Sequence, residues 1–499
     1  MSTLSELLPS GGGGSTVDFV ASGTLPNGKP VILKADGTVE VVAQTTTVIS
    51  ESIPSSSPTV FNTNYSDYTS VSFDPNDSSK FVVAYETQSN GDGAAAIGVI
   101  TGSSISFGSA YTFSTGNISY VSVAFDPNNA NKFVVAYMDQ QNSGYGIVRA
   151  GSVSGTSISY SSLSLFSPHF VTAGISLAFD PNASGKFVIA FSDMDASYYG
   201  KARVVTLSGN SFSYGSEVTY NSANTGPPSV SFDPNDSGRF VIVAESGGSS
   251  GRARVGLVTG TSISFGGLST FNSGSSQFPS VSFDPNNVGK CIIAYRDGGS
   301  SGYGKVVVGT TSSNSISFGS EYTFNSSATE HISVLFDSYG SGKFVVIYRD
   351  DGNSRYGTAR SGTRSGNAVS FGSELVFNSG DSERMSVSFN PVNKGRFVAT
   401  YVNGANSGRG TAILGQLGFT QTTINLTATN FVGTSTAAYT NGQTATIAVQ
   451  GGLSTNQTGL TIGSTYFVQP TGTLATTAGT PSVNAGKALS ATTLLLKDL

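Results

Sequence analysis

SVSFDPNDSSKFVVAY, residues 70–85, is the first clear copy of a phrase that returns along most of the chain. Seven copies are marked by one phenylalanine each, at Phe73, Phe125, Phe179, Phe232, Phe283, Phe336 and Phe389. Their spacing stays between 51 and 54 residues, which is close to the length of a four-stranded propeller blade. The repeat therefore predicts a seven-bladed β-propeller.

Each copy divides into four predicted strands. In the first copy, residues 70–73 alternate small polar and apolar residues, as in a strand with one packed face, and an Asp-Pro-Asn turn follows. Residues 81–85 are apolar on both faces, so we expect them to lie buried between neighbouring blades. A Gly/Ser-rich loop leads to a third strand at 94–101, and a bent outer strand covers 104–113.

The seventh copy stops after three strands, at residues 386–390, 396–401 and 411–416. The missing fourth strand has a counterpart before the first copy, because residues 48–51 and 59–62 match the pattern of 315–318 and 322–325. We therefore expect an N-terminal strand to close the ring by pairing into the last blade, which would remove a free sheet edge.

The repeat and its flanks predict an all-β chain with four regions. Residues 1–15 form a flexible tail that includes four consecutive glycines, and residues 16–44 form an N-terminal β segment. The propeller covers residues 45–417. Residues 418–499 lack the repeat and form a small C-terminal β-rich module with turns such as Asn441-Gly442.

Composition excludes several classes of function. The net charge of −5 comes without a local basic cluster, so nucleic acid is not an expected partner. Cys291 is the only cysteine, which excludes an intramolecular disulfide or a thiolate metal cluster. The N-terminus lacks the features of a secretory signal, and no run of about 18 apolar residues occurs. We expect a soluble protein with no membrane insertion and no ordinary signal peptide.

Catalytic and metal-binding motifs are scarce. The two histidines, His169 and His331, stand in different copies, and no nucleophile elbow, zinc-binding motif or phosphate-binding loop is present. We expect no enzyme activity, no cofactor and no metal site.

One acid recurs at the turn of six copies, as Asp74, Asp126, Asp180, Asp233, Asp284 and Asp337, and Asn390 replaces it in the seventh. Calcium needs about six converging oxygens, which one carboxylate per blade does not supply. We therefore interpret the acid as the residue that starts each Pro-Asn turn.

Candidate binding residues lie in the loops between the second and third strands. Four tyrosines occupy similar Gly-rich settings, and two Arg-Asp pairs precede them: Tyr145, Tyr199, Tyr303, Tyr356, Arg296, Asp297, Arg349 and Asp350. Aromatic rings beside charged hydrogen-bonding groups suit a sugar or a protein surface. The alternative is that each tyrosine packs between blades, since repetition at one position is typical of a structural role.

Both ends of the chain resemble flanking modules of virion structural proteins of tailed bacteriophages that infect marine bacteria and cyanobacteria. The resemblance rests on residues 21–42, ASGTLPNGKPVILKADGTVEVV, and on residues 428–452, 459–477 and 485–498. The FDPN repeats are similar to repeats in tail-fibre proteins. The resemblance implies a virion location but leaves the appendage open.

This resemblance leads to three functional hypotheses. The first is a non-enzymatic tail fibre or fibre-associated adhesin, a homo-oligomer that contacts other virion proteins through its ends and a host glycan or protein through the propeller. The second is a capsid or tail decoration protein that recognises no host. The third is a glycan-active enzyme on the tail.

Overall fold

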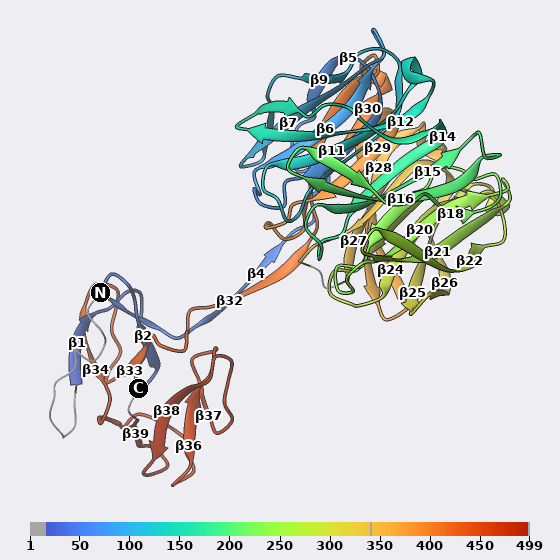
Figure 1. Ribbon diagram of the computed structural model, residues 1–499. Coiled ribbons are helices and arrows are strands. Elements are labelled where there is room, and N and C mark those ends of the chain that lie inside the picture. Colours follow the sequence, from blue (N-terminus) through green and yellow to red (C-terminus); the bar gives the residue numbers. More distant parts are fainter. Residues whose placement is uncertain (1–15, 340–341, 498–499) are drawn as a thin grey trace. The chain divides into compact units, whose positions relative to one another are not determined.

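The computed structural model describes residues 16–339 and 342–497, and their structure is all-β (Figure 1). The expected flexible tail lies outside the described residues. The chain divides into two compact units, one built from residues up to Ile49 together with residues from Phe419 onward, the other from Ser50–Gly418. No helix among the described residues is long and apolar enough to cross a membrane.

The second unit contains the seven copies, and in the first of them β5 (Thr59–Phe73) pairs with β6 (Lys80–Thr87). Antiparallel pairing continues through β7 (Asp92–Thr101) to β8 (Ser104–Phe107) and β9 (Tyr111–Ser114). The next two copies contain β10 (Ile118–Phe125), β11 (Lys132–Asp139), β12 (Tyr145–Ser154), β13 (Ser157–Tyr160), β14 (Ser164–Phe179), β15 (Lys186–Asp193), β16 (Tyr199–Ser208), β17 (Ser211–Tyr214) and β18 (Val218–Asn221).

The same antiparallel order recurs in the remaining four copies. Their strands are β19 (Ser229–Phe232), β20 (Arg239–Ser246), β21 (Ser250–Thr259), β22 (Ser262–Asn272), β23 (Ser276–Phe283), β24 (Lys290–Asp297), β25 (Tyr303–Ser312), β26 (Ser315–Phe336), β27 (Lys343–Asp350), β28 (Tyr356–Ser365), β29 (Ala368–Phe389), β30 (Arg396–Asn403) and β31 (Arg409–Gln416). Short 3₁₀ turns follow four of the second strands, at Gln140–Asn142, Gly298–Ser300, Asp351–Asn353 and Gly404–Asn406. This arrangement is consistent with a β-propeller.

The serines of the repeated phrase join neighbouring copies. Ser72 Oγ accepts a hydrogen bond from the Phe125 amide at 3.0 Å, and Ser282 Oγ accepts one from the Phe336 amide at 3.1 Å. These contacts explain the alternation of serine with apolar residues, because the hydroxyls satisfy backbone donors that no adjacent strand pairs. The intervening apolar side chains, Val71 among them, are buried.

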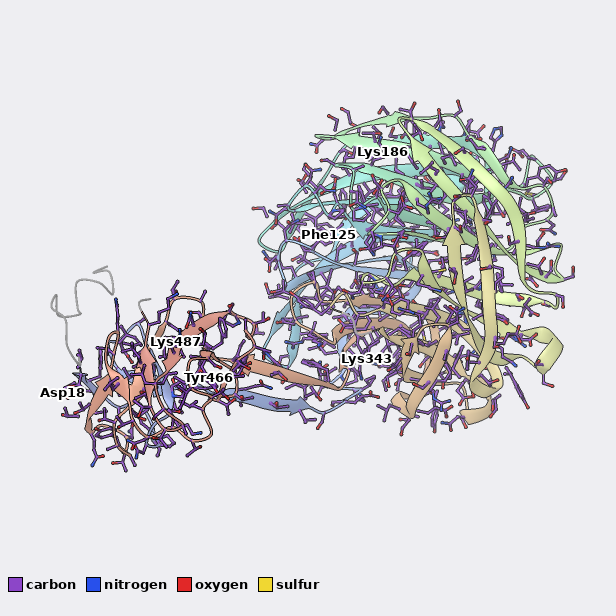
Figure 2. All side chains as sticks on the ribbon, turned by 90° about the horizontal axis from the view of Figure 1, so that it is seen from below. Asp18, Phe125, Lys186, Lys343, Tyr466 and Lys487 are labelled. Atoms are coloured by element: carbon purple, nitrogen blue, oxygen red, sulfur yellow. The ribbon has the colours of Figure 1, made fainter. Side chains whose placement is uncertain are left out.

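The seven phenylalanines that mark the copies come together around one cavity. Phe73 and its six counterparts all line a space of about 450 Å³ at the end of the unit where the Asp-Pro-Asn turns lie. Figure 2 labels Phe125 in the second unit, and Asp18, Tyr466 and Lys487 in the first. Equivalent residues of all seven copies therefore share one axial space.

The repeated aspartates have the turn role that the sequence predicts. Asp180 is buried, and its Oδ1 accepts a hydrogen bond from the Asn182 amide at 2.9 Å. Its Oδ2 accepts a second bond from the Gly238 amide of the next copy at 3.0 Å. The acid thus starts its own turn and also ties it to the neighbouring copy.

The N-terminal strand pairs with the seventh copy as expected, but through a shorter segment. Thr59 and Val60 of β5 pair with Ala412 and Thr411 of β31. Val48 instead pairs with Thr420, because β4 (Gln44–Ile49) forms a ribbon with β32 (Phe419–Ile424). Residues 45–49 therefore belong to the first unit and contribute no strand to the repeat.

The first unit combines segments that the sequence analysis assigned to separate regions. Strand β1 (Thr16–Val20) pairs with β34 (Thr444–Ala448), and β2 (Pro30–Leu33), next to β3 (Val39–Val41), pairs with β33 (Phe431–Ser435). A second sheet contains β35 (Leu453–Ser454), β36 (Thr465–Val468), β37 (Leu474–Ala475), β38 (Val483–Ala488) and β39 (Leu494–Leu496). Residues from both ends of the chain share one apolar core, in which Ile32 and Val42 meet Phe431.

Candidate functional site

A β-bulge interrupts the first strand of the copies, at the end of the sheet opposite the Asp-Pro-Asn turns. Six bulge residues adopt φ values between 47° and 57°, namely Tyr68, Tyr120, Ala173, Phe278, His331 and Arg384, and Pro227 stands at the same position of the fourth copy. Left-handed backbone in bulky residues costs on the order of 1–3 kcal/mol each and is concentrated at functional sites. We call this end of the second unit the bulge face.

Bulge residues of adjacent copies contact each other. The rings of Tyr68 and Tyr120 lie 5.2 Å apart, as do those of Phe278 and His331, and the Arg384 guanidinium lies 4.6 Å from the Tyr68 ring centre. No sequence motif marks these residues, because their types differ from copy to copy. Only their distance from the repeated phenylalanine, five residues in six copies and six in the third, could have identified them.

One sector of the bulge face carries a network of ion pairs. Arg296 contacts Glu330 at 2.7 Å, and Arg349 contacts Glu330, Asp351 at 2.7 Å and Glu383 at 3.4 Å. The Arg349 side chain is only 6 % exposed. The predicted binding residue Arg349 is therefore committed to internal contacts, whereas the Arg296 Nε has no hydrogen-bond partner among the described residues.

Asp297 and Asp350 stabilise the loops in which they lie. Asp297 Oδ1 accepts hydrogen bonds from the Gly299 amide at 3.0 Å and from Asn272 Nδ2 at 3.2 Å. Asp350 Oδ1 makes the equivalent contacts with Gly352 and Asn325, both at 3.1 Å. Both carboxylates are buried, so they stabilise the loops through these hydrogen bonds and are not exposed to a ligand.

The four predicted tyrosines, Tyr145, Tyr199, Tyr303 and Tyr356, are the first residues of β12, β16, β25 and β28, and each is half-buried. Each pairs through its backbone with the acid that ends the preceding strand, as Tyr303 does with Asp297. Within the described residues their rings form no aromatic pair. Neither their binding role nor their alternative packing role is decided by these contacts, and both stay predictions.

A cavity opens on the bulge face beside the ion-pair network. It has a volume of about 540 Å³ and is lined by Pro227, Glu245, Gln277, Phe278, Pro279, Arg296 and Glu330. The Glu245 carboxylate accepts a hydrogen bond from Ser275 Oγ at 2.7 Å. Apolar rings and both signs of charge thus face one space, where a side chain of a polypeptide could insert.

Three large apolar side chains are exposed in one part of the third copy, on a loop and on the strand bonded to it. Phe170 is 36 %, Met194 43 % and Tyr198 38 % exposed. The Met194 amide donates to the Phe170 carbonyl at 2.9 Å, and Tyr198 ends the same loop as Met194. We call these residues the apolar patch. Aromatic residues and methionine are enriched in protein interfaces.

Two ionisable groups at this end of the molecule have shifted pKa values. Burial, together with the neighbouring Asp67 carboxylate, raises the pKa of Glu86 to about 7. Burial and the positive charges of Arg349, Arg384 and Arg355 lower the pKa of His331 to about 3. Glu86 therefore titrates near neutral pH, whereas His331 is neutral there.

No protein-family model and no curated protein matches the sequence. Among solved structures, Sqt1 of Saccharomyces cerevisiae is 11 % identical, with a TM-score of 0.45, and the match covers 73 % of this chain and 99 % of that chain. Sqt1 of Chaetomium thermophilum is 12 % identical, with a TM-score of 0.46 and coverages of 71 % and 96 %. The structure of the same protein bound to the N-terminus of ribosomal protein L10 is 12 % identical, with a TM-score of 0.47, and the match covers 73 % of this chain and 100 % of that chain.

These solved structures are fungal proteins, and they contradict the functional interpretation drawn from the end segments. The expected tail fibre or adhesin, the alternative decoration protein and the location on a phage particle are therefore wrong. The resemblance of the end segments itself stays an expectation, as does the predicted homo-oligomer.

Proposed function

We propose that this chain is a non-enzymatic protein-binding protein in which residues 50–418 form a seven-bladed β-propeller and the bulge face receives the partner. Three features support the ring: the four-stranded pattern of the copies, the pairing of β31 with β5, and the cavity shared by seven equivalent phenylalanines. A closed ring of sheets holds its loops rigidly, which limits the entropy lost on binding.

The observation that carries the binding function is the apolar patch. Exposed phenylalanine, methionine and tyrosine side chains stand on one loop and on the strand bonded to it, although a protein surface normally scatters such residues singly. A partner that covers them would bury large apolar area at the centre of a contact, where a few residues dominate affinity. The cavity around Phe278 and Arg296 offers a second, mixed anchor on the same face.

A non-enzymatic role agrees with the structural contacts that the charged side chains of the loops make. Asp297 and Asp350 are buried and hold their loops, and Arg349 is enclosed by three carboxylates. The exposed apolar side chains of this chain are what favour a protein partner.

The test is peptide selection on the full chain. A displayed library of random peptides is enriched on the wild-type protein, and the affinity of the selected peptides is measured by calorimetry. We expect the triple variant Phe170→Ser, Met194→Ser, Tyr198→Ser to bind them at least about tenfold more weakly while its melting temperature is retained.

The matched control replaces three other exposed apolar residues, Leu268, Val288 and Val376, by serine. This control should bind like the wild type. Peptides that bind the apolar-patch variant and the wild type equally would exclude the patch as the binding surface, and failure to enrich any peptide would argue against a peptide-binding function.

A further inference from the structure

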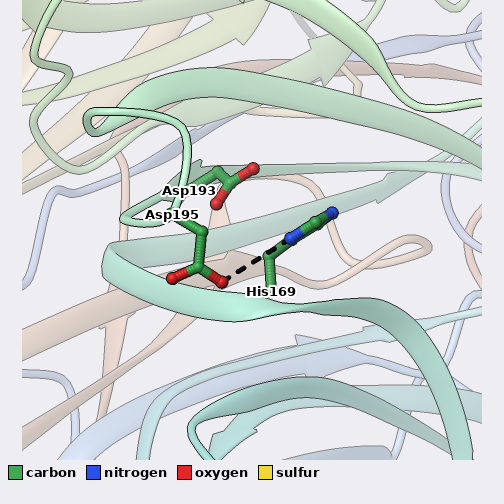
Figure 3. Close-up of side chains that lie close together, drawn as sticks. All are labelled: His169, Asp193 and Asp195. Carbon is green, nitrogen blue, oxygen red and sulfur yellow. Dashed lines mark ion pairs between the residues drawn. The ribbon is translucent and has the colours of Figure 1, made fainter.

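Three potential metal ligands come together in the third copy, beside the apolar patch (Figure 3). His169 lies in β14, Asp193 ends β15, and Asp195 lies in the loop that follows. His169 Nδ1 and Asp195 Oδ2 are 3.6 Å apart, and one ligand atom from each of the three residues lies within 4.8 Å of the other two.

Asp193 has fewer hydrogen bonds than Asp297, the equivalent acid of the fifth copy. Asp297 accepts hydrogen bonds from Gly299, Asn272 and Ser300. Asp193 is only 2 % exposed, yet within the described chain its carboxylate accepts a single bond, to Oδ1 from the Ala196 amide at 3.2 Å. Its Oδ2 accepts none there.

A sequence difference explains this deficit. Asn272, which reaches Asp297 of the fifth copy, pairs with Gly251 of the fourth copy. Ser167 pairs with Gly146 at the equivalent position before Asp193. The shorter serine does not supply the amide that reaches Asp297. A buried carboxylate that has lost a donor is costly unless another positive group compensates it. In the third copy, the side chains of His169 and Asp195 occupy the neighbouring space.

We propose that His169, Asp193 and Asp195 bind one divalent transition-metal ion, for which Zn²⁺ is the expected occupant. One imidazole and two carboxylates form a ligand set that suits zinc, with a fourth position for water. Ligand atoms about 2.1 Å from a tetrahedral ion are about 3.4 Å apart. The His169–Asp195 separation of 3.6 Å is already near that value.

To bind one ion, the three ligand atoms must move closer together than the 4.8 Å within which they now lie. Two of the three side chains are exposed enough to make this movement. His169 is 42 % and Asp195 57 % exposed, whereas Asp193 provides a fixed, buried ligand. Glu217 Oε2 lies 4.0 Å from His169 Nε2, the ring nitrogen that does not face Asp195. A carboxylate on the second nitrogen of a metal-binding histidine orients the ring. Glu217 is therefore the positioning residue of this site.

From the sequence alone no metal site is expected, because each histidine stands alone in its copy. His169 and Asp193 are 24 positions apart, and no local motif joins them. Binding would fix the Met194 loop to β14, which carries Phe170, so the site would order the apolar patch. The metal site can nevertheless be tested without any protein partner.

The experiment titrates Zn²⁺ into the metal-free full chain by calorimetry, with Co²⁺ absorption as a second readout of coordination. We expect one ion per chain, a rise in melting temperature, and tetrahedral Co²⁺ bands. His169→Gln and Asp195→Asn should each weaken binding at least tenfold without lowering the metal-free melting temperature, since both side chains are exposed. Glu217→Gln should weaken it about 10- to 100-fold.

His331→Asn is the control, since it removes the only other histidine and should leave Zn²⁺ binding unchanged. Absence of one-to-one Zn²⁺ binding would overturn the proposal. Zn²⁺ binding that is equally tight in His169→Gln would also overturn it. Ca²⁺ binding to His169→Gln that is as tight as Zn²⁺ binding would do so too.

Discussion

Ser388 Oγ accepts a hydrogen bond from the backbone amide of Phe73 at 3.0 Å, although 315 positions separate the two residues. Ser386 Oγ makes the parallel contact with the Val71 amide at 3.2 Å. These bonds join the seventh copy to the first by the same chemistry that joins the first to the second. The first and last copies are thus neighbours in space.

This relationship predicts the effect of removing both serines. The double variant Ser386→Ala, Ser388→Ala leaves two backbone amides without acceptors, so we expect the free energy of unfolding to fall by about 1–3 kcal/mol. Urea denaturation measures this change. Ser280→Ala with Ser282→Ala, which cuts an internal junction, should cost a similar amount. The exposed pair Ser106→Ala, Ser159→Ala should cost almost nothing. If the first variant behaves like the exposed pair, the junction is not closed in solution.

A second prediction concerns glycines that lie under aromatic rings. In the second copy, a Cβ added at Gly151 would lie 2.1 Å from Cζ of the buried Phe133 ring. Gly151→Ala should therefore destabilise the protein by about 1–3 kcal/mol through overpacking. Gly267→Ala is the matched control, because a Cβ there meets no atom within 4 Å. Equal melting temperatures for the two variants would contradict the close packing.

Glu86 predicts a loss of stability with rising pH. Its pKa is about 7 in the folded protein and 4.5 without the fold. Between these values the folded state holds a proton that the unfolded state has released, so the free energy of unfolding falls as pH rises through this window. Glu86→Gln mimics the protonated form. The variant should match the wild type in urea denaturation at pH 5 and exceed its stability at pH 8. A difference that is the same at both pH values would show that Glu86 does not titrate in this range.

His331 predicts the opposite dependence at lower pH. Its pKa falls from 6.5 to about 3 on folding, so between these values only the unfolded state binds the proton. The free energy of unfolding therefore decreases as pH falls below 6.5, by at most about 1.4 kcal/mol per pH unit.

His331→Asn removes this contribution while tolerating the left-handed backbone. The stability of the variant relative to the wild type should rise between pH 7 and pH 4.5 in thermal or urea unfolding. A relative stability that stays constant across this range would place the His331 ring in solvent.

The sequence predicted those features that depend on local pattern. Period, strand order and the turn role of the repeated aspartates follow from short-range alternation and turn chemistry, which act within a few residues. The pairing of residues 59–62 with the seventh copy was also predictable, since the missing fourth strand had one evident counterpart.

Tertiary structure decided which non-equivalent residues meet. A repeat shows that Tyr68 and Arg384 occupy the same position in different copies, but it does not show that they touch. Arg349 was a reasonable binding candidate until Glu330 and Glu383, from two other strands, joined the nearby Asp351 around it. His169 looked isolated until the pairing of β14 with β15 brought it to Asp193 and Asp195. Each of these outcomes depends on contacts between distant segments, whose geometry is set by how the sheets pack and not by the residues nearby in the chain.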